Sequence, residues 1–123
     1  MIKTGYVVGT GASIDITLGF IPNHVTLLNT EGLARLDWTS DMPAAAGVKQ
    51  ITAGTMTYIT TLGISPLGST SGLTVSADNT LTDNNTITMT NPKGFRIGAD
   101  TDMNVSGEDI YWVATGLGGD SDN

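Results

Sequence analysis

The chain contains no cysteine, few basic residues and no long hydrophobic run. Without cysteine it forms neither a disulfide framework nor a thiolate metal site. Five Lys and Arg against 12 Asp and Glu give a net charge of -7 at pH 7, so the basic surface that nucleic acid requires is missing. No apolar run approaches the ~20 residues of a membrane-spanning helix, and the first five residues lack the apolar stretch of a secretory signal. We therefore expect no nucleic acid and no membrane as partners, and folding in a reducing cytoplasm.

Strong helix formers are also scarce, with only three Lys, two Glu and one Gln among 123 residues. The chain is instead rich in Thr and holds 16 Gly. Thr is β-branched and suits a pleated surface, whereas Gly marks tight turns. No amphipathic helix is available to connect parallel strands, so the strands are expected to be antiparallel.

Alternating apolar and polar residues mark the strands directly. In residues 13–18 the apolar side chains fall on every second position, and residues 86–90 place three Thr on one face and Ile87 and Met89 on the other. Turn signals separate such segments at intervals of roughly 8–12 residues. The pattern predicts an all-β fold: a single antiparallel β-sandwich, jelly-roll-like domain or barrel of about eight to ten short strands.

The expected boundaries are an extended N-terminal arm at residues 1–4, the β domain at 5–115 and a flexible acidic tail at 116–123. Three expected strands, at residues 6–8, 24–28 and 56–60, are apolar on both faces. Such strands lie centrally in a sheet or at a contact between subunits.

One stretch, residues 41–48, breaks the strand rhythm. It can form a single helical turn with Asp41 as the N-cap and Gly47 as the stop. One alternative is an ordinary loop between strands. The other is a protruding contact loop, in which Met42 and Pro43 would belong to an uncharged contact surface.

Residues for catalysis are few. The only histidine, His24, stands at the start of an expected strand, and residues 68–72 carry Thr70 where a nucleophile elbow requires serine. The carboxylates of Asp15 and Asp37 fall on the polar phase of their strands, so we expect solvated side chains rather than the buried acid that glycoside hydrolysis requires. We expect no enzymatic activity and no cofactor.

A weak calcium candidate lies near the C-terminus. Asp100, Asp102 and Asn104 present oxygen ligands at alternate positions, as the start of an EF-hand loop does. Val105 then occupies the position of the sharp-turn glycine, and Tyr111 that of the bidentate glutamate. Asp and Asn are also common turn residues, so a plain turn is the alternative.

The aromatic residues divide into two groups. Trp38 and Trp112 fall on the apolar phase of their strands and are expected in the core. Tyr58 and Tyr111 are candidates for an outer face, where they would contact a carbohydrate or a protein.

Two parts of the chain carry a resemblance to a known family. The first begins with residues 5–22, and the second combines Gly94-Phe95-Arg96-Ile97-Gly98 with the closing aromatic strand at 110–114. Together they resemble the small β-rich virion proteins of tailed bacteriophages. The resemblance covers about half of the chain, carries no catalytic signature and lacks a motif for a site.

The resemblance implies a non-enzymatic virion protein, and within that class a capsid decoration (cement) protein. Such a protein is made in the host bacterial cytoplasm, binds the major capsid protein on the outer surface of the shell, bridges capsomers and forms a homotrimer. The residues expected at protein interfaces are Ile2, Lys3, Thr4, Met42, Pro43 and Tyr58.

Two other functions stay open. One is a tail, neck, baseplate or head-fibre component of the same kind of particle. The other is a carbohydrate- or receptor-binding module that uses the exposed tyrosines. Fold class alone does not distinguish them.

Overall fold

The computed structural model describes residues 1–68, 73–75, 87–89 and 93–116, and all regular structure in this part of the chain is β-strand. The expectation of an all-β fold with about eight to ten short strands is confirmed. The strands are β1 (Ile2–Val8), β2 (Ile14–Thr17), β3 (His24–Asn29), β4 (Ala34–Thr39), β5 (Ala46–Gln50), β6 (Met56–Leu67), β7 (Leu73–Val75), β8 (Ile87–Met89), β9 (Gly94–Ile97) and β10 (Asp109–Thr115).

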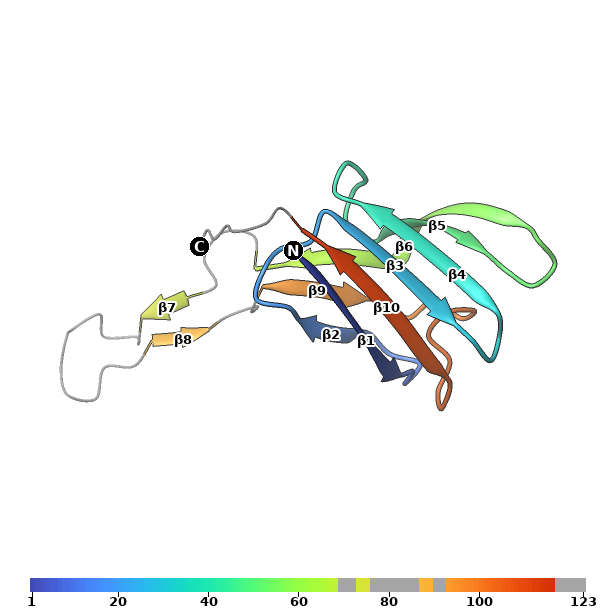
Figure 1. Cartoon of the computed structure of the whole chain (residues 1–123), viewed down its shortest axis with the longest axis horizontal. Coiled ribbons are helices and arrows are strands. Elements are labelled where there is room, and N and C mark those ends of the chain that lie inside the picture. The colour runs from blue at the N-terminus through green and yellow to red at the C-terminus, as the bar shows by residue number, and fades with distance from the viewer. Residues whose placement is uncertain (69–72, 76–86, 90–92, 117–123) are drawn as a thin grey trace.

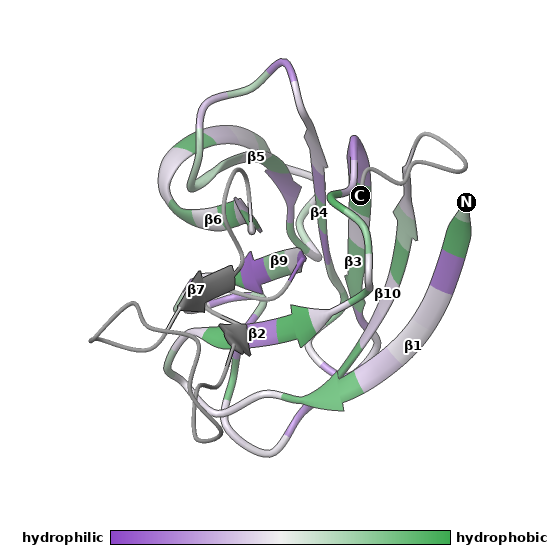
Figure 2. Ribbon diagram, turned by 90° about the vertical axis from the view of Figure 1, so that its left-hand side faces the viewer, coloured by the Kyte–Doolittle hydropathy of each residue, from purple (hydrophilic) through white to green (hydrophobic). Residues whose placement is uncertain are grey.

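Eight of these strands form one antiparallel sheet in the order β1-β10-β3-β4-β5-β6-β9-β2, and β7 and β8 pair with each other. The sheet curls into a half-barrel, so that β2 and β9 form one wall and β3, β10 and β1 the other (Figures 1 and 2). The two edges of the sheet, β1 and β2, are close in the sequence but are separated by every other strand of the sheet.

The curl depends on the long strand β6. Its first half pairs with β5, and its second half pairs with β9. Between the two halves Leu62 adopts a positive φ of 65°, and the register against β5 shifts between Ala46 and Gly47. An irregularity of this kind bends a strand and increases its twist, and it directs the chain from one wall to the other.

The core fills the inside of the curl. Trp38 is 1% exposed and Trp112 is 8% exposed, so the expectation that both tryptophans pack in the core is confirmed. Phe95 packs edge-on against Trp112 with ring centroids 5.6 Å apart, which joins the two walls. The other buried apolar side chains are Leu18, Phe20, Val25, Leu27, Ala34, Leu36, Ala46, Ile64, Ile97, Met103, Ile110 and Ala114.

The segment before β5 forms turns rather than a helical turn. Ala45 has a φ of 67°, which is incompatible with a right-handed helix, and its N–H donates to the carbonyl of Ile64. The helical alternative for residues 41–48 is therefore wrong. Cross-strand pairing of Ala46 and Gly47 with β6 outweighs the local helix signals.

Residues 2–4, expected as an extended arm, are extended and form the first half of β1. Ile2 pairs with Thr115 and Thr4 with Val113. At the end of this ladder the amino group of Met1 donates to the carbonyl of Gly116 at 2.9 Å. The segment thus belongs to the sheet, and the tail beyond residue 116 lies outside the described residues.

Candidate functional site

The outer face of the curled sheet carries one continuous row of side chains across six strands. Register places these residues in line across β1, β10, β3, β4, β5 and β6. The members of this outer row are, in order, Tyr6, Tyr111, Leu28, Arg35, Gln50 and Met56. At a strand spacing of about 4.8 Å the row spans roughly 24 Å.

The outer row is mainly apolar although it faces solvent. Tyr6 is 63% exposed, Met56 65%, Tyr111 44% and Leu28 37%. Its one charged member, Arg35, donates from Nε to Asp37 Oδ2 at 2.9 Å. Exposed apolar side chains that adjoin one another across strands are typical of contact surfaces.

Two hollows lie along this row. The first, of about 360 Å³, lies over β1 and β10, where the rings of Tyr6 and Tyr111 are 5.7 Å apart. Leu28 and Val113 also line it. The expectation that Tyr111 lies on an outer face is therefore confirmed.

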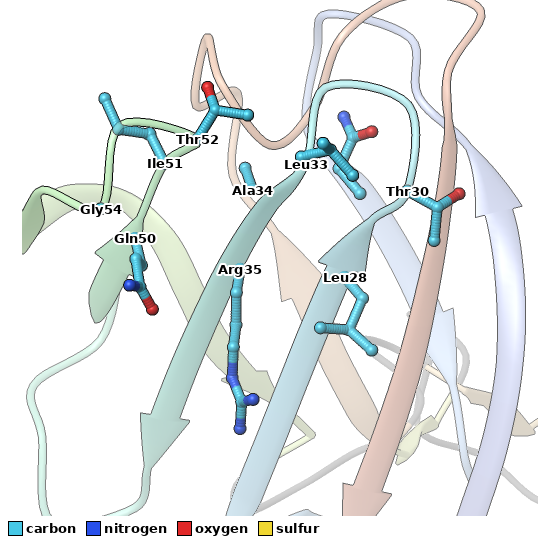
Figure 3. Close-up of a pocket in the computed structure, with 10 residues that line it drawn as sticks. Leu28, Thr30, Leu33, Ala34, Arg35, Gln50, Ile51, Thr52 and Gly54 are labelled. Carbon is cyan, nitrogen blue, oxygen red and sulfur yellow. The ribbon is translucent and has the colours of Figure 1, made fainter.

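The second hollow, of about 450 Å³, lies between the β3–β4 turn and the β5–β6 turn (Figure 3). Leu28, Leu33 and Ile51 provide its apolar walls, and Arg35 is the single charged residue of its lining. Leu33 is 62% exposed and adopts a φ of 56°, an unfavourable conformation for a residue with a Cβ. The turn thus holds a large apolar side chain at the rim of the hollow in a strained backbone conformation.

The interface residues expected from the sequence occupy different places. Ile2 is 69% exposed and Thr4 is also exposed, both on the outer phase of β1. Lys3 lies on the inner phase, and its Nζ donates to the carbonyl of Leu18 at 2.8 Å. It therefore links β1 to the chain just after β2.

Of the remaining three, Tyr58 is 53% exposed on β6, next to the outer row. Met42 is half-buried and packs against the core. Pro43 is exposed, and its carbonyl accepts the Nε1–H of Trp38 at 3.2 Å. The 41–45 turn thus serves partly to cover and satisfy a core tryptophan.

At the acidic calcium candidate, the positively charged side chain of Lys49 contacts the carboxylates. Lys49, on β5, donates from Nζ to Asp100 Oδ1 at 2.9 Å and to Asp102 Oδ2 at 2.7 Å. The other Asp100 oxygen accepts the N–H groups of Asp102 and Met103. Burial alone lowers the pKa of Lys49, but the hydrogen bonds and charges of the two carboxylates outweigh it and raise this pKa above its ordinary value.

Asn104 is used to fix loops. Its Oδ1 accepts the N–H groups of Thr10 and Gly11, and its Nδ2 donates to the carbonyls of Ala12 and Gly98. No cluster of three His, Cys, Asp or Glu side chains suited to a metal ion is found in residues 1–68, 73–75, 87–89 and 93–116. In this structure the three candidate ligands bind Lys49 and backbone groups.

A second buried amide holds the end of β3. Asn29 is 1% exposed; its Nδ2 donates to the carbonyl of Met103 and to Glu108 Oε1, and its Oδ1 accepts the N–H groups of Glu31 and Gly32. This network connects the β3–β4 turn, which borders the second hollow, to the loop before β10.

His24 is the first residue of β3, and its side chain is exposed. Its Nε2 lies 3.3 Å from Thr26 Oγ1 and 3.9 Å from Asp37 Oδ1, and Thr26 Oγ1 itself donates to Asp37 at 2.7 Å. The hydroxyl of Thr26 thus has a carboxylate as its acceptor. The serine- and threonine-rich segment at residues 69–72, including Thr70, lies outside the described residues.

Sequence reasoning missed most of the outer row and also Lys49. The available signal was the presence of apolar residues on both phases of residues 6–8, 24–28 and 56–60, which indicates an apolar face beyond the core. Lys49 gives no such signal, because its carboxylate partners are distant in the sequence.

Comparison of the chain with protein-family models, with curated proteins and with solved structures gives no match. Within the described residues, no helix is long and apolar enough to cross a membrane.

Proposed function

We propose that this protein is a non-enzymatic structural component of a bacteriophage particle, a capsid decoration protein that binds the outside of the assembled shell. The class rests on the resemblance carried by residues 5–22, 94–105 and 110–114. The observation that carries the mode of binding is the outer row, an exposed and mainly apolar line of side chains across six strands.

The outer row suits contact with another protein. Burying ionised groups costs free energy unless each finds a partner. Among the six residues of the outer row the only ionised side chain is that of Arg35, which is already paired with Asp37. The hollow beside Arg35 can receive an apolar side chain of the shell protein against Leu28, Leu33 and Ile51. On a shell, many such modest contacts act together because each copy sits on a repeating lattice.

The test is whether the protein is part of the particle and binds through the outer row. Particles of the phage that encodes the chain would be purified, stripped of this protein and incubated with recombinant chain. We expect rebinding to the heads and a higher melting temperature of the shells. A Leu28→Glu/Tyr111→Glu variant, which places two charges on the row, should lose this binding.

The matched control is Ser13→Glu/Thr17→Glu, which adds the same charge at exposed positions in and beside β2. It should bind as the wild type does. Binding to tails alone would favour a tail, neck or baseplate role, and absence of the protein from the particles would refute the proposal.

A carbohydrate-binding module is the second candidate, because Tyr6 and Tyr111 lie side by side along an open hollow. Exposed aromatic rings can stack on sugar faces. This function predicts binding on a glycan array. Tyr111→Ala should abolish this binding, and the Ser13→Glu/Thr17→Glu control should retain it. An array without any bound glycan would remove this candidate.

A further inference from the structure

β1 forms one edge of the eight-stranded sheet, so one side of its backbone has no strand partner among the described residues. The terminal hydrogen bonds of its ladder join Met1 to Gly116 and Gly9 to Glu108. Since hydrogen-bonded pairs alternate along an antiparallel ladder, the odd-numbered residues bond β10. The N–H and C=O groups of Ile2, Thr4, Tyr6 and Val8 therefore point away from the sheet.

This edge lacks most of the features that protect edge strands from pairing, namely short length, proline, bulges and outward charges. β1 has seven residues, no proline and an unbroken register with β10. Its outward side chains at positions 2, 4, 6 and 8 are all uncharged and exposed. Its one charge, on Lys3, lies on the inner phase and is bonded to Leu18.

The opposite edge of the same sheet provides an internal comparison. β2 has only four residues. Its Asp15 is exposed and pairs with Arg96 of β9 at 2.7 Å. Thus β2 is short and has an exposed charge, whereas β1 is longer and its outward side chains are uncharged. Of the two edges of the described sheet, β1 offers the longer backbone for pairing.

We propose that β1 pairs with β1 of a second copy of this chain, antiparallel and centred on Gly5. In this register Ile2 faces the partner's Val8, and Thr4 faces the partner's Tyr6. The outward-pointing N–H and C=O groups of all four residues then find partners, because even-numbered residues meet even-numbered residues. The contact is isologous and closes as a two-fold pair.

Electrostatics permit this pairing despite the net charge of -7 on each chain. The nearest acidic residue in register is Asp109, opposite Val8 at one end of β1. The two Val8 residues of the pair lie at opposite ends of the contact, roughly 20 Å apart. That separation exceeds the screening length of about 8 Å at physiological salt.

Pairing also joins the outer faces of the two copies. Beyond the β1 contact, Tyr6 leads to Tyr111 and Leu28, and Thr4 leads to Val113. The apolar surface therefore continues across the two-fold axis. The inference does not depend on the decoration role, since it concerns the backbone edge of β1, although the side chain of Tyr6 also belongs to the outer row.

The experiment measures the mass of the purified full-length chain by sedimentation equilibrium from about 1 µM to 1 mM, because a single edge contact is at the weak end of specific interfaces. We expect a reversible increase to twice the 12.7 kDa of one chain. Thr4→Lys/Tyr6→Lys places lysine opposite lysine across the axis and should weaken association by at least about tenfold.

Thr4→Lys/Tyr6→Glu is the matched variant, because it changes the same two positions but sets opposite charges face to face. It should restore the dimer. A wild type that stays monomeric, or that forms the trimer implied by the family resemblance, would overturn the inference. So would equal association of the two variants. Binding of either variant to shells is a separate measurement and tests only the proposed function.

Discussion

Replacement of Lys49 by methionine should destabilise the fold through the carboxylate that it leaves behind. Lys49 and Asp100 have side chains only 13% and 8% exposed, and they meet at 2.9 Å. Removal of one partner from a buried pair costs about 3–5 kcal/mol. Asp100 keeps two backbone N–H donors, from Asp102 and Met103, so we expect the lower end, about 3 kcal/mol.

Urea unfolding followed by tryptophan fluorescence measures this loss, since both tryptophans are buried. Asp102→Asn should cost under about 1 kcal/mol, because its side chain is 46% exposed and solvent screens the pair. Lys49→Met/Asp100→Asn removes both buried charges and should be more stable than Lys49→Met alone. If the double variant were less stable than the single one, the unpaired carboxylate would not be the cause.

Three further predictions concern other parts of the sheet. A hydrogen bond from Arg96 lowers the pKa of Asp15. The pair therefore stabilises the fold fully above the ordinary pKa of 3.8, and this contribution is lost as the pH falls through the lower folded value. In Asp15→Asn the urea midpoint of unfolding should depend less on pH in the acid range than in the wild type. In Gly94→Ala the new methyl group would overlap the carbonyl of Ile16, so β2 must separate from β9 and thermal melting should show a loss of at least about 2 kcal/mol. Leu33→Gly relieves a positive φ of 56° and should stabilise the fold by about 1 kcal/mol in the same assay, whereas an unchanged melting temperature would contradict the strain.

The strands were predictable where one face is buried and the other solvated. Alternation in residues 13–18 and 35–39 predicts β2 and β4 because the core accepts only every second side chain. The same rule predicts that Trp38 and Trp112 are buried. These features are local, and a short window of sequence contains them.

Other features depend on partners far along the chain. The pairing of β1 with β10 and the contact of Lys49 with Asp100 join segments that no local pattern connects. The helical turn that residues 41–48 could form is absent for the same reason, since pairing with β6 sets the conformation of Ala45. The outer row was predictable only in part. Strands that are apolar on both faces indicate an apolar surface outside the core, but only the strand register aligns Tyr6 with Tyr111 and Leu28.

The central claim is that this protein decorates a phage shell through the outer face of its sheet. A cryo-electron microscopy map of the particle that is proposed to contain this chain tests it most directly. The account predicts density for the half-barrel on the outside of the head, with Tyr111, Leu28 and the hollow beside Arg35 against the major capsid protein. A map that placed the chain in the tail, or that turned this face to solvent, would contradict it.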